Sequence, residues 1–125
     1  MCLVRGVLPA DVLLIAEAPG KNESALGSPL IGPAGKLLDR IVLEAFCDKL
    51  RCAFTNLVGC MPIDPGTLNK LEEPGYEQIA TCRPRLAEII SIARPRMVVS
   101  VGKLADRWLA EALPKGTVLC AGGAV

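Results

Sequence analysis

The sequence predicts an α/β fold in which a parallel β-sheet is covered by helices. Short apolar runs alternate with amphipathic stretches along the chain, as is typical of successive β-α-β units. Apolar residues make up 51% of the chain and aromatic residues only 3%, so the core has to be built from Val, Leu, Ile and Ala. The 125 residues fit one domain, 1–125, and no internal repeat divides it.

Each expected element of the first half follows from its own pattern. Val12 to Ile15 or Ala16 is a wholly apolar run, which suits a strand buried on both faces of a parallel sheet. A second strand is expected over 52–57, and the Gly- and Pro-bearing segment 61–74 is interpreted as a loop. Between the strands a helix is expected over about 34–45, because apolar residues recur there on one face: Leu37, Leu38, Ile41, Val42 and Ala45.

The second half continues the alternation. A third strand at 97–101, a short helix over about 103–112 and a fourth strand at 117–120 complete the order β-α-β-α-β-α-β. Before them a helix is expected over 76–93, which Pro84 must kink or restart. Its apolar residues at helical spacing are Ile79, Cys82, Leu86, Ile89 and Ile90.

Two carboxylates lie in the turn after the first strand. Glu17 stands at the carboxyl end of that strand, where α/β proteins bind ligands, and Glu23 follows beyond a Pro-Gly step. Gly32 and Gly35 let backbone N–H groups approach an anion at the start of the next helix. The same pattern fits a plain Pro-Gly turn in which both carboxylates are merely solvated.

Four segments form an ordered set of motifs. The first is 16–39, which begins with Ala-Glu-Ala-Pro-Gly and ends with Leu-Leu-Asp. The second is 54–62, with the sequence Phe-Thr-Asn-Leu-Val-Gly-Cys-Met-Pro, and the third is 79–84, with the sequence Ile-Ala-Thr-Cys-Arg-Pro. The fourth is 95–105, which ends with Gly-Lys-Leu-Ala. Together they resemble the uracil-DNA glycosylase superfamily, and most closely its iron–sulfur, family 4-like branch. The resemblance implies a three-layer α/β/α fold with a central four-stranded parallel sheet. It also implies a base-excision repair protein that hydrolyses the N-glycosidic bond of uracil in DNA.

The resemblance gives roles to individual residues. Glu17 and Glu23 take the acidic positions that activate water and stabilise the cationic sugar, and Asn56 takes the position whose amide reads the uracil edge. Leu30 stands where the family usually has a Phe. For Asn56 the alternative is a side chain that caps a turn. The assignment requires Glu17 and Asn56 to line one cavity sized for a pyrimidine. Backbone contacts to phosphate are implied at Gly20, Gly32 and Gly35.

The chain contains six cysteines, and without a secretion signal thiols are favoured over disulfides. The family branch holds a [4Fe-4S] cluster with a Cys-x-x-Cys-like pair before the first strand and a pair that matches Cys60 and Cys82. Cys2 is the candidate remnant of the upstream pair, but no Cys-x-x-Cys occurs in the chain. Cys47 and Cys52 are interpreted as buried packing residues. We therefore expect an incomplete set of cluster ligands.

Two departures from the family pattern predict a weakened enzyme. Leu30 lacks the stacking face of a Phe, which is worth roughly 1–3 kcal/mol per base. The chain has no His, whereas the last family motif supplies an imidazole for the leaving uracil, and losing such a donor costs about 10²–10³ in rate. Without the upstream cysteine pair and the downstream His motif, the domain is expected to be truncated at both ends. We expect weak or absent glycosylase activity with DNA binding better retained.

Two other functions stay open. A non-catalytic nucleic-acid-binding or interaction module would keep the fold and show salt-dependent DNA affinity without base release. A nucleotide- or phosphate-binding α/β domain would use 32–35 as an anion cradle, although neither Gly-x-x-x-x-Gly-Lys-Ser/Thr nor Gly-x-Gly-x-x-Gly occurs.

The net charge of +1 is unevenly distributed. Residues 1–75 carry 7 basic and 9 acidic groups, and residues 76–125 carry 7 basic and 4 acidic groups. No apolar run approaches the about 20 residues that span a bilayer. We expect a cytoplasmic monomer whose partner is uracil-containing DNA, single-stranded or with the base flipped out, and not a membrane. The basic residues of the second part either contact phosphates or cover solvated helices: Arg83, Arg85, Arg94, Arg96, Lys103, Arg107 and Lys115.

Overall fold

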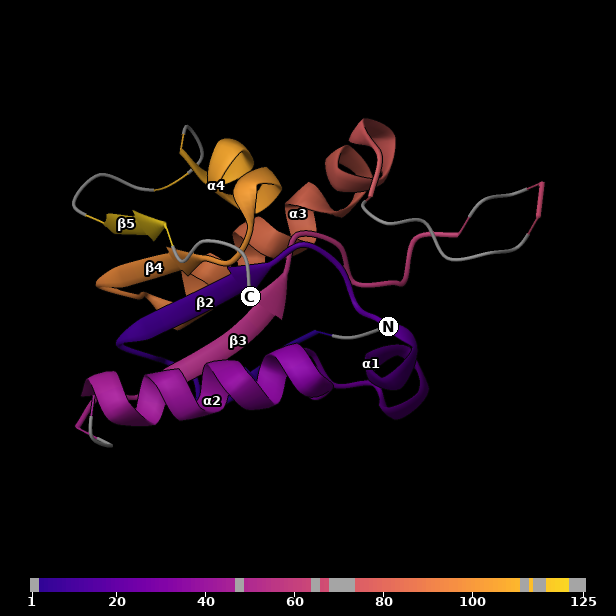
Figure 1. Ribbon diagram of the computed structural model, residues 1–125. Coiled ribbons are helices and arrows are strands. Elements are labelled where there is room, and N and C mark those ends of the chain that lie inside the picture. The colour runs from indigo at the N-terminus through magenta and orange to yellow at the C-terminus, as the bar shows by residue number, and fades with distance from the viewer. Residues whose placement is uncertain are drawn as a thin grey trace.

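A β-sheet lies between two layers of helices (Figure 1). The computed structural model describes residues 3–46, 49–63, 66–67, 74–110, 113 and 117–121. Helix α2 covers one face of the sheet, and α3 and α4 cover the other. The predicted three-layer α/β/α fold is thus confirmed. The elements are β1 (Arg5–Gly6), β2 (Val12–Ala16), α1 (Lys21–Leu26), α2 (Pro33–Phe46), β3 (Cys52–Asn56), α3 (Tyr76–Ala93), β4 (Met97–Ser100), α4 (Lys103–Leu109) and β5 (Val118–Ala121).

The strand order is β1-β3-β2-β4-β5, with β2 in the centre. The pairs β2–β3, β2–β4 and β4–β5 are parallel, so the four predicted strands form the parallel sheet as expected. A fifth strand, β1, pairs antiparallel with β3 at the edge and was not predicted. It has only two residues, which is too short to leave a period-two pattern in the sequence.

Two helices differ from expectation. Helix α3 is continuous from Tyr76 to Ala93 with Pro84 inside it, so of the two outcomes expected at Pro84, a kink or a restart, the restart does not occur. Helix α1 was not predicted, because none of its six residues is buried and it therefore has no apolar face. It begins at a capping box in which the backbone N–H of Gly20 donates to Glu23, three residues further on.

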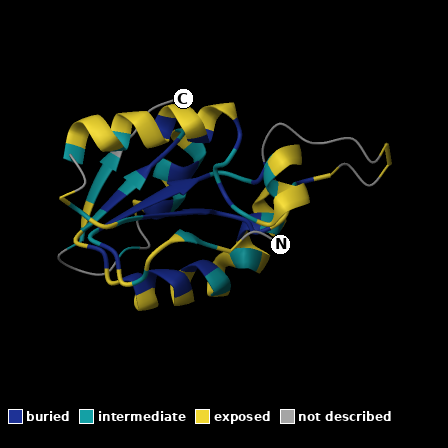
Figure 2. Ribbon diagram, turned by 90° about the horizontal axis from the view of Figure 1, so that it is seen from below, coloured by how far each residue is buried: buried dark blue, intermediate teal, exposed yellow. Residues whose placement is uncertain are grey.

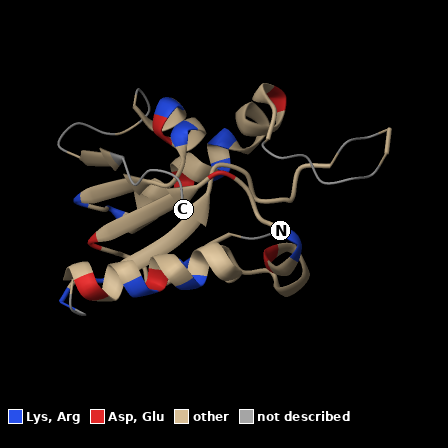
Figure 3. Ribbon diagram, viewed as in Figure 1, with Lys and Arg blue, Asp and Glu red and all other residues tan. Residues whose placement is uncertain are grey.

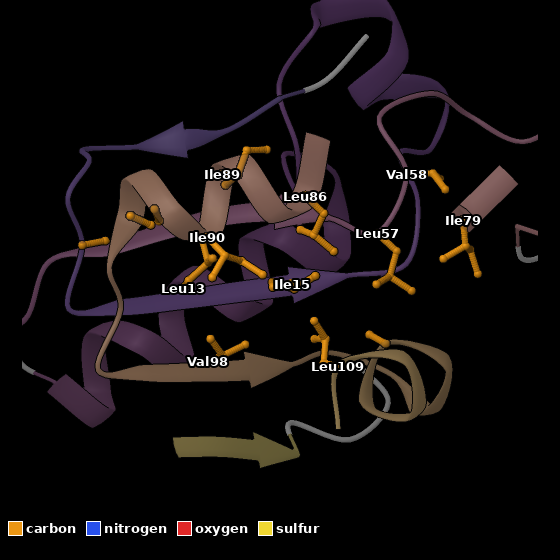
Figure 4. Close-up of a cluster of buried hydrophobic side chains, with 14 residues drawn as sticks. Leu13, Ile15, Leu57, Val58, Ile79, Leu86, Ile89, Ile90, Val98 and Leu109 are labelled. Atoms are coloured by element: carbon orange, nitrogen blue, oxygen red, sulfur yellow. The ribbon is translucent and has the colours of Figure 1, made fainter. Parts of the chain in front are cut away.

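The core has two parts, one on each face of the sheet. Toward α3 and α4, Leu13, Ile15 and Val98 pack against apolar side chains of both helices (Figure 4). Toward α2, Leu14 and Phe54 pack with Leu38. All five residues of β2 are buried, and Figure 2 shows the buried residues gathered in the sheet and on the inner helix faces. Within the described ranges, no helix is both long and apolar enough to cross a membrane.

Arg5 on β1 ties the edge of the sheet to the loop before α2. Its guanidinium donates to the carbonyl oxygens of Pro29 (3.0 Å) and Leu30 (2.9 Å) and to Oδ1 of Asp39 on α2 (2.9 Å). It also lies over the ring of Phe54, 4.0 Å from the ring centroid. One side chain therefore fixes the position of this loop against both β3 and α2.

Arg5→Ala is expected to lower the free energy of unfolding by about 2 kcal/mol, because hydrogen bonds that involve a charged group contribute roughly 1.5–3 kcal/mol. Urea denaturation measures the change. Arg40→Ala on α2 is the matched control, since Arg40 is exposed and should change the free energy by less than about 0.5 kcal/mol. Equal losses in the two variants would contradict the anchoring role of Arg5.

Candidate active site

A cavity of ≈ 520 Å³ opens at the carboxyl ends of the parallel strands. Four parts of the chain line it: the turn after β2 with the first residues of α1, the loop that leads into α2, Pro62 in the segment after β3, and the start of α4. A volume of this size is in the range of small-molecule sites. Six of the predicted site residues line it together: Glu17, Gly20, Glu23, Leu30, Gly32 and Gly35.

The carboxylate of Glu17 is held at the start of α4. Its Oε2 accepts a hydrogen bond from the backbone N–H of Leu104 at 3.3 Å. Gly102 has a φ of +102°, and a Cβ on it would lie 2.6 Å from the same oxygen, so only Gly lets the backbone approach this closely. Oε1 has no hydrogen-bond partner among the described residues. Glu17 is thus positioned by the backbone and still has an oxygen for a water or a substrate.

Glu23 has a different environment. Its Oε1 accepts from the N–H of Gly20 (3.0 Å), and its Oε2 accepts from the N–H groups of Ile31 (3.0 Å) and Gly32. These bonds join the start of α1 to the loop before α2. The amides of Gly20 and Gly32 would therefore contact a phosphate only if Glu23 released them.

Leu30 forms one wall of the cavity in a strained conformation. Its φ of +56° lies in the left-handed region, which is uncommon for a residue with a branched side chain. A Cβ on Gly35 would overlap the carbonyl oxygen of Leu30, so Gly35 lets α2 pack directly on this backbone. Gly35 accordingly has a packing role whatever it contacts in a ligand complex.

Asn56 ends β3 opposite Ala16, the last residue of β2. The side chain is 1% exposed, and neither Nδ2 nor Oδ1 has a hydrogen-bond partner among the described residues. Strand alternation puts it on the same face of the sheet as Phe54, which is also the face of the cavity. Asn56 is buried and is absent from the lining of this cavity, so the expectation that Glu17 and Asn56 line one cavity is not met in this structure. A turn-capping role lacks the hydrogen bond that it would need.

Backbone hydrogen bonds join the segment after Asn56, the predicted recognition residue, to the segment that carries Glu17, the predicted catalytic residue. The N–H of Leu57 donates to the carbonyl of Ala16 at 2.9 Å, and the N–H of Val58 donates to the carbonyl of Glu17 at 3.3 Å. The structure therefore brings Glu17 and Asn56 to the same edge of the sheet, at the ends of neighbouring strands.

The predicted cysteine ligands are only partly assembled. Cys60 and Cys82 line one cavity of ≈ 350 Å³, and Cys2 lies outside the described residues, as does Cys47. The described residues contain no group of three or more Cys, His, Asp or Glu that could hold a metal. Cys52 lies on β3, where burial, followed by the charge of Asp11, raises the pKa of its thiol. A raised pKa and contacts with the α2-side core agree with a packing role for Cys52.

The basic residues of the second half that the structure describes do not line one common cavity. Lys103 lines the active-site cavity, whereas Arg83 and Arg107 line a separate hollow between α3 and α4. Arg85 is partly buried and donates to the carbonyl of Asn56 at 2.7 Å. Arg94 caps the end of α3. Phosphate contact and a solvated helix surface therefore both stay open for these residues, and any phosphate contact would involve smaller groups of them.

Sequence reasoning did not single out Gly102 or Arg5 as site residues. A Gly directly after a strand pattern was the available signal for Gly102. Arg5 gave no signal, because its partners are 24 to 34 residues away in the chain. Together the groups at this edge offer a carboxylate with an open oxygen, a neighbouring cation and an unpartnered amide.

Comparison with known proteins places the chain in a family. The family model of the uracil DNA glycosylase superfamily matches residues 5–123. The Type-4 uracil-DNA glycosylase of Saccharolobus solfataricus is 36% identical over 101 residues, which are 80% of this chain and 44% of that protein. Those of Pyrobaculum aerophilum and Thermotoga maritima are each 30% identical, over 85% and 80% of this chain and 51% and 49% of their own lengths. The chain spans about half the length of these relatives. Since the family model covers nearly all of it, the chain belongs to the uracil DNA glycosylase superfamily.

Proposed function

We propose that this domain recognises uracil in DNA and hydrolyses its N-glycosidic bond slowly, as part of base-excision repair. The observation that carries the proposal is the Asn56 amide, which is buried at the edge of the sheet with no hydrogen-bond partner. An unpaired buried amide costs about 1–3 kcal/mol, and a ligand that pairs with it removes this cost. An amide that offers a donor and an acceptor matches the edge of uracil.

Glu17 is the group that acts on water in this proposal. The oxygen of a water attacks the anomeric carbon, the bond from that carbon to the uracil nitrogen breaks, and its electron pair leaves with uracil. The proton of the water passes to Glu17, whose Oε1 is open, and the carboxylate charge stabilises the cationic sugar before that. Glu23 acts as a positioning residue, since three amides already bind it. Lys103 supplies the positive charge in the cavity lining for a DNA phosphate.

Glu17→Gln is expected to slow uracil release by about 10²-fold or more, because the amide cannot take the proton. Single-turnover release of uracil from a single-stranded oligonucleotide measures this. Glu88→Gln on the exposed face of α3 is the control and should match the parent rate. With no His, the parent itself is expected to be about 10²–10³-fold slower than the Saccharolobus solfataricus relative.

This assay, together with DNA and nucleotide binding measurements, separates the proposed glycosylase function from the two alternatives, a nucleic-acid-binding module and a phosphate-binding domain. Equal rates for Glu17→Gln and Glu88→Gln would contradict the role of Glu17. Salt-dependent DNA binding without any base release would instead assign the chain as a binding module. Tight binding of a free nucleotide with no preference for uracil would favour the phosphate-binding alternative.

Asn56→Ala is expected to abolish the preference for uracil-containing over cytosine-containing DNA, because the two bases differ in the edge that an amide reads. It should not lower the free energy of unfolding by more than about 1 kcal/mol, since the amide makes no hydrogen bond in the protein. Thr55→Val is the matched control. The Thr55 hydroxyl donates to the carbonyl of Leu3 at 2.6 Å, so its loss should cost about 1 kcal/mol of stability and leave the uracil preference intact. The reverse pattern would show that Asn56 is structural.

The described residues do not fit a complete [4Fe-4S] cluster, which needs four ligands. Only Cys60 and Cys82 share a cavity, and no further ligand joins them in the described part of the chain. We infer that they are a partial ligand set, and no step of the proposed reaction depends on iron.

Anaerobically purified protein is accordingly expected to be colourless and to contain less than one cluster per chain by iron analysis. A brown protein with a full complement of iron would overturn this inference. Cys2→Ser would then test whether the thiol of Cys2 completes the set. The single-stranded DNA preference, the monomeric state and the cytoplasmic location expected from the sequence stay predictions.

A further inference from the structure

Two of the four aromatic rings of the protein, those of Tyr76 and Trp108, lie together between α3 and α4. The chain has one Trp, one Tyr and two Phe. Phe46 and Phe54 belong to the core beneath α2. Tyr76 at the start of α3 is 74% exposed, and its ring centroid lies 5.3 Å from that of Trp108 on α4. Because Tyr76 is exposed, core packing does not explain why one of the few aromatic residues of the chain stands at this position.

Cations surround this pair of rings. The guanidinium of Arg83 lies over the Trp108 ring, 5.7 Å from its centroid. Tyr76, Trp108, Arg83 and Arg107 line a hollow of ≈ 490 Å³ between α3 and α4, here termed the α3–α4 hollow. No Asp or Glu of the described residues lines it. Figure 3 shows basic segments on both helices. The hollow therefore favours an anion that also carries flat apolar rings.

The acidic groups on these helices face elsewhere. Glu77 follows Tyr76 but lines the separate cavity that contains Cys60 and Cys82. Asp106 on α4 accepts a hydrogen bond from the Ser100 hydroxyl at 3.1 Å. Glu88, the other acidic residue of α3, is exposed and is not among the residues that line the hollow. None of these three carboxylates is thus among the groups that would meet a ligand in the α3–α4 hollow.

The hollow adjoins the active-site cavity along the chain. Lys103 lines the cavity, and the next residue of α4, Leu104, lines the hollow. A DNA strand whose uracil enters the cavity would need a path for its neighbouring nucleotides, and the first turn of α4 separates the two sites by one residue.

We propose that the α3–α4 hollow is a second DNA subsite that binds single-stranded DNA beside the target nucleotide. One base stacks on the rings of Tyr76 and Trp108, and Arg83 and Arg107 contact the flanking phosphates. Aromatic stacking with basic groups is the chemistry by which single strands are bound without sequence preference. A protein partner would have to supply carboxylates to pair with the two guanidinium groups, whereas a DNA strand carries phosphates and flat bases together. The proposal rests on DNA being the substrate, as argued above.

Trp108 is the only Trp in the chain, so its fluorescence reports on this hollow directly. The probe is a single-stranded thymidine oligonucleotide without uracil, titrated into the full chain. Saturable quenching is expected, with roughly ten-fold weaker binding for Tyr76→Ala and for Arg83→Gln, because one base stack or one phosphate contact is lost. Tyr76→Phe keeps the ring and should bind like the parent. A fully paired duplex should quench little.

Arg96→Gln is the charge-matched control, since Arg96 is exposed and lies before β4, at the amino ends of the parallel strands. The proposal fails if Tyr76→Ala and Arg83→Gln weaken binding no more than Arg96→Gln, or if anisotropy shows bound DNA while Trp108 fluorescence is unchanged. Quenching that depends on protein concentration alone would assign the hollow to a second copy of the chain. Because the probe lacks uracil, failure of uracil release would leave this result unaffected, so the two proposals are tested separately.

Discussion

The position of β2 in the centre of the sheet determines where the site forms. The chain leaves β2 for β3 through α2 on one face, and it returns past β2 to β4 through α3 on the other face. Segments that leave neighbouring parallel strands toward opposite faces cannot fill the edge between them, so a crevice remains there. Glu17 follows β2 and Gly102 follows β4, so both lie at this crevice.

Two charged side chains hold the loop of residues 29–32, which forms one wall of the crevice. Glu23 accepts from the amides of Ile31 and Gly32, and Arg5 donates to the carbonyls of Pro29 and Leu30. The polar backbone groups of residues 29–32 are thus bound by side chains from α1 and β1, which compensates for the absence of regular secondary structure there. This support explains how Leu30 keeps a positive φ, a conformation that persists only where its surroundings impose it.

The sequence was sufficient for the parallel strands and the longer helices, because buried strands appear as apolar runs and helices bury a periodic face. It was insufficient for β1 and α1, which are short and lack such a face. The same limit applies to the site. Glu17 was found from its place after an apolar strand and Asn56 from motif resemblance, but Arg5 acts through partners that only the folded chain brings near. Likewise, Glu17 and Glu23 look equivalent in the sequence, and only their different amide partners distinguish them.

The burial of Asn56 has a consequence for how a base would be recognised. Its amide is unpartnered, yet the side chain is 1% exposed, so uracil reaches it only after the covering groups move. The unpaired amide raises the free energy of the closed form by about 1–3 kcal/mol, and a base that pairs with it removes that penalty in the open form. Uracil would therefore shift the equilibrium toward the open form, whereas a base that cannot pair with the amide would not. Discrimination between uracil and other bases would then arise because pairing with the Asn56 amide favours the open form, in addition to the shape of the cavity.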